Sequence, residues 1–131
     1  MLGRIGFIGL GSMGAPMASN LIASGFSVIC YDIAGTSERA PQGAEIAASV
    51  TQIAQSADLV VISVNTQLAV QDVTEEIARS EAAKVSIVMD TSTIGPNISR
   101  TVNDCLRKVN ISFIDSPVAG GSGKTGVGHA A

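Results

Sequence analysis

The sequence lacks the features of a secreted, membrane-spanning or nucleic-acid-binding protein. Its 131 residues carry a net charge of −3 and no basic run, so they offer no positively charged face for nucleic acid. The strongest apolar run, Leu59–Ile62, is far shorter than the roughly 20 residues that cross a bilayer. No charged leader precedes Ile5, so we expect no secretion signal. We therefore predict neither a membrane nor a nucleic acid as partner.

Cysteine and histidine are also scarce. The two cysteines, Cys30 and Cys105, lie in a strand-like and a helix-like run, as buried structural thiols do. We expect a reducing, cytoplasmic setting without a disulfide. The single histidine, His129, lies with Lys124 in a glycine-rich end, and this position is typical of a solvated side chain. The sequence thus assigns no catalytic residue and no metal ligand.

What the sequence does have is an alternation of Val- and Ile-rich runs with segments of helical period. These runs are nearly continuous, as expected of parallel strands buried on both faces. The alternation predicts one α/β domain over residues 1–131, with a doubly wound parallel sheet. The expected strands are Arg4–Ile8, Ser27–Tyr31, 44–47, Leu59–Val64, Ser86–Asp90 and Ser112–Asp115.

Three helices can be placed from their end signals. The first follows Gly14 and stops at Gly25, a residue suited to a helix C-terminus. The second begins at Ser49, where Gln52 three residues later completes a capping box, and ends near Ser56. The third begins at Pro96 and carries one apolar stripe, consisting of Ile98, Val102, Leu106 and Val109.

The strongest functional signal is a glycine-rich turn between the first strand and the first helix. The first glycine permits a tight turn, the second allows backbone to approach a pyrophosphate, and the third allows close packing of helix on strand. The helix N-terminus would supply N–H groups to the phosphates. The alternative is that the glycines serve turn geometry alone. The motif is Gly9-Leu10-Gly11-Ser12-Met13-Gly14.

Asp32 follows the second strand, 18 positions after Gly14. A carboxylate there can accept hydrogen bonds from both adenosine ribose hydroxyls, and it would repel a 2′-phosphate, so the sequence favours NAD over NADP. Arg39 is close enough in sequence to meet such a phosphate, so NADP is less favoured than NAD but stays an alternative. The alternative is an aspartate that caps the turn into Ile33.

Further polar stretches follow the later strands and should meet at the same sheet edge. Thr91, Ser92 and Thr93 offer hydroxyls either to a ribose or substrate or to the N-terminus of the following helix. The segment Pro117–Gly121 carries two glycines whose N–H groups could receive a carboxylate, or it is a plain turn.

Taken together, four segments resemble the β-hydroxyacid dehydrogenases, a family that includes 3-hydroxyisobutyrate, tartronate semialdehyde and threonate dehydrogenases and the cofactor domain of 6-phosphogluconate dehydrogenase. The resemblance runs from Arg4 to Gly128 and implies a Rossmann-type fold. It is carried by Gly6–Gly14, Tyr31-Asp32, Asp90–Ile94 with Pro96, and Asp115–Gly121.

The resemblance implies roles for individual residues. Asp32 would hold the adenosine ribose, Val64 and Asn65 would flank the cofactor, and Thr93 would approach its nicotinamide end. Gly120 and Gly121 would hold the carboxylate of a small 3-hydroxy acid, although Ala119 stands where the family usually has serine. The pyrophosphate would be lined by Gly9, Gly11, Met13 and Gly14, and Leu10 and Ser12 of the same turn would also bind the cofactor.

In enzymes resembling this one, a lysine on a later helix exchanges the hydroxyl proton, and it would lie past Ala131. By the same resemblance, the remaining strands and the helical substrate and dimerisation domain of such enzymes are absent from residues 1–131. We therefore expect a sheet incomplete at its C-terminal end, self-association as a homo-oligomer through the exposed edge, and a polypeptide that binds NAD weakly without turnover. One alternative is a non-enzymatic NAD sensor. Another is a P-loop at Gly121–Thr125, which lacks the required glycine at Val118 and a following helix.

Overall fold

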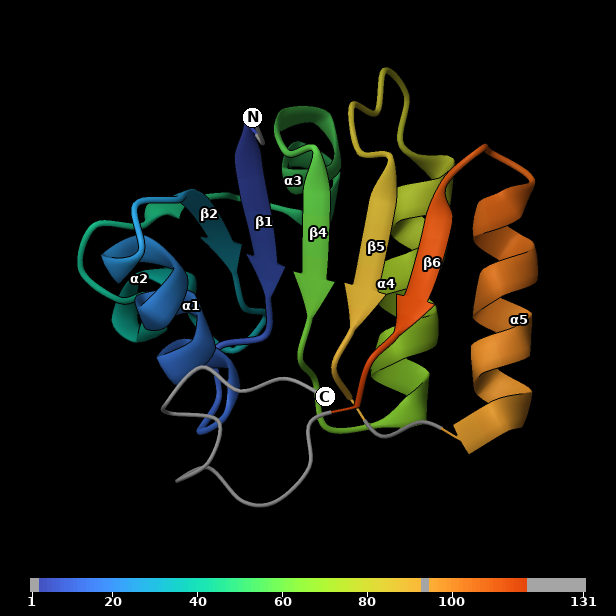
Figure 1. The fold of residues 1–131 in the computed structure, drawn as a ribbon, viewed down its shortest axis with the longest axis horizontal. Helices are drawn as coiled ribbons and strands as arrows, with labels where there is room; N and C mark the ends of the chain where they lie inside the picture. Colours follow the sequence, from blue (N-terminus) through green and yellow to red (C-terminus); the bar gives the residue numbers. More distant parts are fainter. Residues whose placement is uncertain (1–2, 93–94, 118–131) are drawn as a thin grey trace.

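The computed structural model of the chain describes residues 3–92 and 95–117, which form one parallel sheet covered by helices (Figure 1). The sheet order is β3-β2-β1-β4-β5-β6. The first three strands follow one another toward one edge of the sheet and the last three toward the other edge, so the strand order reverses between β1 and β4. This is the Rossmann order, so the predicted fold class is confirmed. The strands are β1 (Arg4–Ile8), β2 (Ser27–Tyr31), β3 (Glu45–Ile46), β4 (Leu59–Ile62), β5 (Ile87–Asp90) and β6 (Ser112–Asp115).

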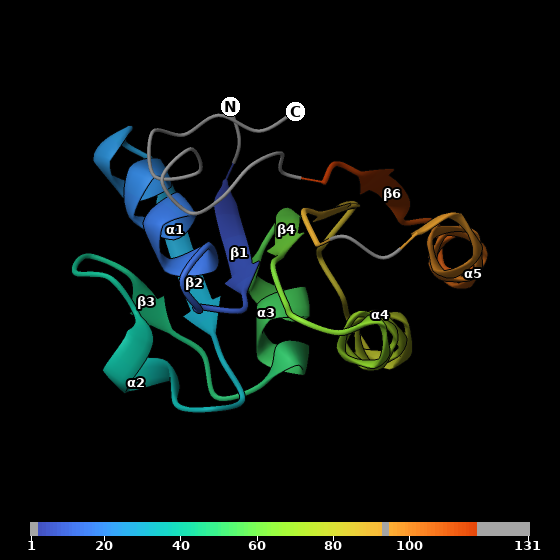
Figure 2. The same cartoon turned by 90° about the horizontal axis from the view of Figure 1, so that it is seen from below.

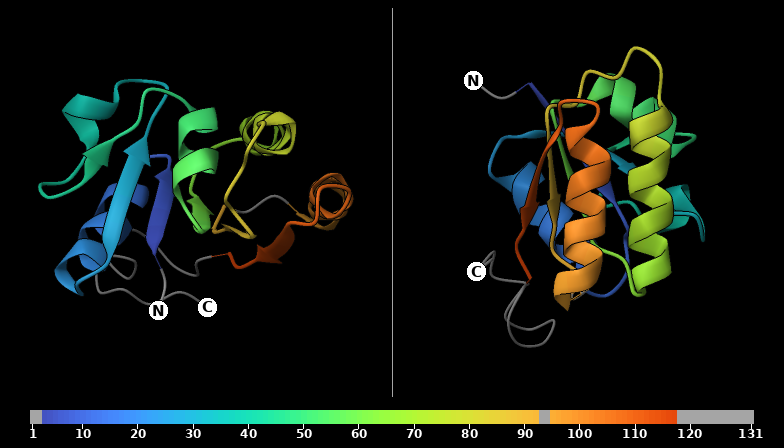
Figure 3. Two further views of the ribbon diagram at one scale, coloured as in Figure 1. Left: turned by 90° about the horizontal axis from the view of Figure 1, so that it is seen from above. Right: turned by 90° about the vertical axis from the view of Figure 1, so that its right-hand side faces the viewer.

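Helices cover both faces of the sheet. Helix α1 packs on one face, and α3 and α4 pack on the other, as the view onto the carboxyl ends of the strands shows (Figure 2). Helix α5 lies beside α4 on the second face (Figure 3). Their bounds are α1 (Gly14–Ala23), α2 (Thr36–Arg39), α3 (Val50–Ser56), α4 (Gln67–Arg79) and α5 (Gly95–Arg107).

Strand β1 is buried on both faces. Phe7 packs with Ala18 of α1, whereas Ile8 belongs to the cluster that contains Ile53 of α3. A Cβ at Gly6 would lie 2.4 Å from Ile53 Cγ2, so α3 packs directly on the strand backbone. The near-continuous apolar run of β1 therefore reflects burial from both sides.

The helix ends explain one correct prediction and one error. Helix α1 ends as predicted, because Gly25 adopts φ 96° and the N–H of Phe26 donates to the Leu21 carbonyl at 3.1 Å. The prediction that Val109 belongs to the stripe of α5 was wrong. Asn110 turns the chain with φ 62°, and the N–H of Ile111 bonds the Leu106 carbonyl, so Ile111 is buried and Val109 is exposed.

The capping box at Ser49 is confirmed in one of its halves. Ser49 Oγ accepts from the N–H of Gln52 at 3.1 Å, but Gln52 Oε1 accepts from the N–H of Ala48 at 2.7 Å rather than from that of Ser49. Either bond satisfies a backbone N–H at the start of α3.

Three further differences concern element bounds. Strand β4 ends at Ile62 rather than Val64, because the N–H of Val64 turns away to Ser92 Oγ. Strands β3 and β5 are shorter than expected. Neither α2 nor α4 was predicted, although Val70, Val73 and Ile77 of α4 recur at helical spacing.

Both cysteines are free thiols, as expected. Cys30 is fully buried, and burial raises the pKa of its thiol to about 11, which keeps it protonated and unreactive. Cys105 is only partly buried. Among the described residues, no helix combines the length and apolarity that a membrane crossing requires.

Candidate functional site

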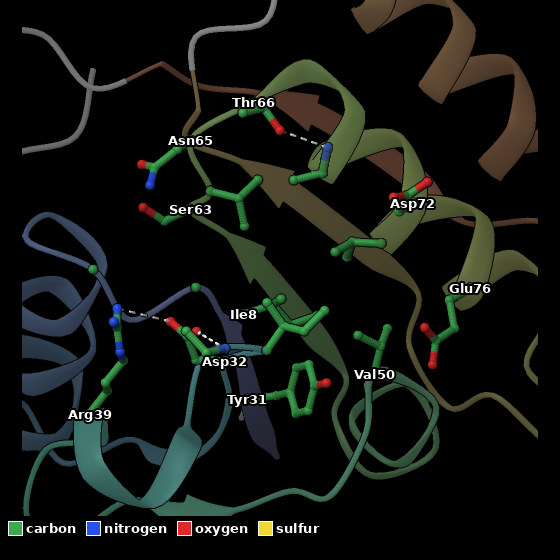
Figure 4. A pocket seen from close by; sticks show the side chains of 17 residues that line it. Ile8, Tyr31, Asp32, Arg39, Val50, Ser63, Asn65, Thr66, Asp72 and Glu76 are labelled. Atoms are coloured by element: carbon green, nitrogen blue, oxygen red, sulfur yellow. Dashed lines mark hydrogen bonds and ion pairs between the residues drawn. The ribbon is translucent and has the colours of Figure 1, made fainter.

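A pocket of about 470 Å³ lies at the carboxyl ends of β1, β2 and β4, where the strand order reverses (Figure 4). The loops after β1 and β4 form its walls, and α4 closes its far side. Open parallel sheets bind ligands at this point. The lining includes the predicted residues Gly9, Gly11, Asp32, Val64, Asn65 and Thr66. It also includes residues that were not predicted, among them Tyr31, Ile33, Ser63, Asp72 and Glu76.

The three motif glycines have three different surroundings. Gly9 adopts φ 100°, and a Cβ there would lie 1.9 Å from the Ser63 carbonyl oxygen. A Cβ at Gly14 would lie 2.0 Å from the Gly9 carbonyl oxygen, so this glycine lets the helix pack on the turn. Among residues 3–92 and 95–117, no atom lies within 4 Å of a Cβ placed at Gly11. The structure therefore leaves open space at the glycine where backbone would meet a ligand.

Helix α1 begins differently from α3 and α4. Ser49 caps α3 and Thr66 caps α4 through side-chain oxygens, whereas Met13 gives α1 no side-chain cap. The first turn of α1 also contains no acidic side chain. Its N-terminus thus keeps positive dipole density available to an anion beside the glycine turn.

Asp32 has a role in the free chain that sequence reasoning missed. Its Oδ2 accepts from the N–H of Leu10 at 2.7 Å, and its Oδ1 accepts from the N–H of Ala34 at 2.8 Å. The carboxylate therefore holds the glycine turn as well as its own turn. Because a carboxylate offers about four lone-pair sites, acceptors remain for ribose hydroxyls.

Arg39 of α2 points toward Asp32 across the pocket wall, with Nη1 4.0 Å from Asp32 Oδ2 (Figure 4). The Arg39 side chain is 47% exposed, whereas the Asp32 side chain is only 10% exposed. A half-exposed ion pair of this length adds little stability. Arg39 therefore remains available to a ligand at the same wall.

A second pocket of about 270 Å³ lies beside the first. It is lined by the glycine turn with Ser12 and Met13 and by the ends of β4 and β5. The two pockets share Gly11 and the segment 63–66, which we call the β4 loop. A ligand with two nucleoside halves could extend along both pockets by crossing this loop. Leu10 lines neither pocket and instead packs in the core near Phe7.

The hydroxyls after β5 are used within the protein. Thr91 Oγ1 donates to the Ile62 carbonyl at 2.9 Å, and Ser92 Oγ accepts from the N–H of Val64 at 2.9 Å. Both residues are buried, so in this arrangement they hold β4 rather than cap α5. Thr93, and the predicted substrate residues Gly120 and Gly121, lie outside the described residues.

Two acidic side chains on α4 border the pocket. Glu76 Oε2 accepts two hydrogen bonds from Thr51, one from its hydroxyl at 3.2 Å and one from its backbone N–H at 3.3 Å. These bonds link α4 to the start of α3. Asp72 lies one helical turn earlier on the same side of the pocket. Their spacing of four residues could have indicated that both side chains lie on one side of a helix, but only if α4 had been predicted. Among residues 3–92 and 95–117, no cluster of side chains suits a metal ion.

Asp90, at the end of β5, is a fully buried carboxylate. Its Oδ1 accepts from the N–H of Ser92 at 3.0 Å, and Oδ2 has no hydrogen-bond partner among the described residues. Burial raises the pKa of Asp90 from 3.8 to about 6; the bonds from Ser92 oppose the rise and the charge of Asp115 adds to it. The ionised form is therefore less stable here than in water.

This shift predicts a pH-dependent stability. The folded chain holds the Asp90 proton more tightly than the unfolded chain, so ionisation costs stability as pH rises from about 4 to 6, by up to about 3 kcal/mol. The Asp90→Asn variant lacks this ionisation, so its unfolding free energy minus that of the wild type should increase over that range and then level off. Urea titrations at pH 4 to 8 measure it. A difference that stays constant with pH would contradict the prediction.

Comparison with known proteins identifies the family of this chain. Residues 4–130 match the family model described as the NAD binding domain of 6-phosphogluconate dehydrogenase. This match extends over Gly121–Thr125, which lies outside the described residues, and favours the dinucleotide interpretation there over a P-loop.

Individual relatives agree. The chain is 33% identical over 129 residues to mitochondrial 3-hydroxyisobutyrate dehydrogenase of Mus musculus, covering 95% of this chain and 38% of that protein. It is 30% identical to the NAD-dependent L-serine dehydrogenase of Pseudomonas aeruginosa, covering 95% and 43%. A structure of 3-hydroxyisobutyrate dehydrogenase from Mycobacterium tuberculosis with L-serine matches with a TM-score of 0.90 at 30% identity, covering 99% of this chain and 45% of that one.

The chain spans less than half the length of these relatives. The family match nevertheless extends over nearly all of its residues. The matched range includes the glycine turn, the strands of the sheet and Asp32. The chain belongs to the family of NAD-binding domains found in 6-phosphogluconate dehydrogenase and in 3-hydroxyisobutyrate dehydrogenase-like oxidoreductases.

Proposed function

We propose that the chain binds NAD along its two adjoining pockets, as the cofactor domain of a dehydrogenase that acts on a small 3-hydroxy acid. The observation that carries the proposal is the open space at Gly11 beside the uncapped N-terminus of α1. A pyrophosphate there would contact bare backbone N–H groups and the positive end of the helix dipole. The larger pocket would then hold the adenosine half, and the smaller one the nicotinamide half.

In this arrangement Asp32 accepts hydrogen bonds from the adenosine ribose. Ile33, which is 91% exposed and lines the larger pocket, offers an apolar face to the adenine ring. Val64 and Asn65 flank the cofactor where the pockets join. Thr93 at the nicotinamide and Gly120 with Gly121 at the substrate carboxylate complete the proposal.

NAD supplies a hydride acceptor, and the chain's own residues bind and orient it. Among the described residues, those at the pockets are suited to holding the cofactor, so the proton exchange on the hydroxyl is left to a group elsewhere in the whole enzyme. The hydroxy acid, a homo-oligomer and a cytoplasmic location remain predictions about the whole protein.

Calorimetry with NAD tests the proposal. We expect heat of binding at millimolar NAD, weaker binding of NADP, and an increase in Tm with NAD because the ligand stabilises the native state. ATP with Mg²⁺ serves as the control and should leave Tm unchanged. The absence of heat from both NAD and NADH in folded protein would overturn the proposal. Absorbance at 340 nm with hydroxy acids then tests turnover separately.

A further inference from the structure

The β4 loop, residues 63–66, lies where the two pockets join and lines both of them. Any ligand that extends from one pocket into the other must pass over this loop. Its backbone position therefore sets the shape of the whole binding surface.

Three of the hydrogen bonds that the β4 loop makes hold its two ends and its middle. The N–H of Ser63 donates to the Ile8 carbonyl at 2.8 Å, which continues the pairing of β4 with β1. At the other end, Thr66 Oγ1 accepts from the N–H of Ala69 at 3.0 Å. Between them, the N–H of Val64 donates to Ser92 Oγ at 2.9 Å, and this bond alone of the three ties the loop to the segment after β5.

Ser92 is in turn held by the side chain of Asp90, at the end of β5. Asp90 Oδ1 accepts from the N–H of Ser92 at 3.0 Å, and the whole Asp90 side chain is buried. The second oxygen of Asp90 is also buried and has no hydrogen-bond partner among the described residues. Asp115 of β6 lies in register with Asp90, so a second acidic residue neighbours this carboxylate.

A buried carboxylate with an unpartnered oxygen is an unfavourable choice for the stability of a sheet. Burial raises the pKa of Asp90 to about 6, which is a measure of that cost. Costly groups of this kind gather at functional sites. The contact that Asp90 makes here leads, through Ser92, to the loop between the pockets.

We propose that Asp90 and Ser92 are positioning residues for the dinucleotide: Asp90 fixes Ser92, the Ser92 hydroxyl fixes the N–H of Val64, and the β4 loop thereby keeps the shape that joins the two pockets. Neither residue needs to touch the cofactor. The inference rests on the proposed function, because it assumes that NAD occupies both pockets.

The Ser92→Ala substitution tests the link. It removes the acceptor for the N–H of Val64, so we expect NAD affinity to fall about tenfold by calorimetry. Ser92→Thr keeps a hydroxyl and should recover most of that affinity. Asp90→Leu should weaken NAD binding as Ser92→Ala does, and Asp90→Asn, which keeps the acceptor oxygen, should recover it.

The control is Ser86→Ala, at the residue that immediately precedes β5 and so lies at the opposite end of this strand from Ser92. The Ser86 hydroxyl donates to the backbone carbonyl of Asp58 at 3.4 Å, so it too bonds the backbone of a neighbouring segment, but Ser86 lines neither pocket. NAD affinity should be unchanged in this variant. If Ser86→Ala weakens NAD binding as much as Ser92→Ala does, general loss of stability is the cause and the inference fails.

The outcomes separate the two proposals. If the wild-type chain gives no heat with NAD or NADH, the proposed function fails. If the wild type binds and folded Ser92→Ala binds equally well, the inference alone fails. Should Ser92→Ala not fold, amide exchange in the wild type decides: the N–H of Val64 should be protected, and rapid exchange there would overturn the link.

Discussion

The Gly11→Val substitution is expected to weaken NAD binding at least about a hundredfold, while Tm changes by no more than about 2 °C. Among the described residues, nothing lies within 4 Å of a Cβ placed at this position, and the φ of Gly11 lies outside the positive range that L-residues rarely adopt. The fold should therefore accept valine. The same space is where a pyrophosphate would meet the backbone, so the added methyl groups should exclude the ligand.

Gly14→Ala is the matched control for this prediction. Its Cβ would lie 2.0 Å from the Gly9 carbonyl oxygen, and a backbone atom cannot move aside as a side chain can. We expect a loss of about 3 kcal/mol in unfolding free energy. Calorimetry and thermal denaturation on both variants separate the effects. A folded Gly11→Val chain with wild-type affinity for NAD would show that no phosphate lies at this glycine.

The contrast between these glycines shows how much of the site the sequence could predict. Spacing alone assigned a tight turn, a ligand approach and a packing contact to the three glycines in order, and their surroundings in the free chain agree with that order. The tight turn at Gly9 and the packing contact at Gly14 could be predicted because the turn, the strand before it and the helix after it are all local in sequence. The approach of a ligand to Gly11 stays a prediction.

Contacts between distant segments could not be predicted in this way. The bond from the N–H of Leu10 to Asp32 joins residues 22 positions apart, and the bond from Val64 to Ser92 joins residues 28 apart. Asp32 was therefore interpreted as a ribose ligand or turn cap only, and Ser92 as a ligand or helix cap. Each depends on which strands become neighbours, which composition does not reveal.

Helix α4 was missed for a different reason. Its periodic residues Val70, Val73 and Ile77 were available, but polar residues between them reduce the apolar signal, and no helix was assigned. Asp72 and Glu76 were consequently absent from the candidate site. A parallel pair such as β4 and β5 requires a crossover, usually a helix, so topology could have identified it.

The second large effect concerns the choice between NAD and NADP at Asp32. Asp32→Asn is expected to lower the ratio of NAD to NADP affinity about a hundredfold or more. At 5 Å and an effective dielectric constant near 20, repulsion between one carboxylate charge and one phosphate charge costs about 3 kcal/mol. Removing the carboxylate charge removes this repulsion, and it also weakens the acceptor for the ribose hydroxyls of NAD.

Arg39 should make the change larger. In the wild type its guanidinium lies 4.0 Å from Asp32 Oδ2, and with asparagine there it loses its anionic neighbour while it still faces the pocket. A 2′-phosphate can then take the place of the carboxylate. NADP binding by Asp32→Asn should accordingly weaken as salt is raised, whereas NAD binding should respond less.

The double variant Asp32→Asn/Arg39→Ala separates the two contributions. If Arg39 holds the 2′-phosphate, the double variant should lose most of the NADP affinity that the single variant gained, with NAD affinity nearly unchanged between the two. Calorimetry with both cofactors at low and high salt provides the measurement. Equal NADP affinity in the single and double variants would limit the effect to the lost charge of Asp32, and Arg39 would then have no part in cofactor choice.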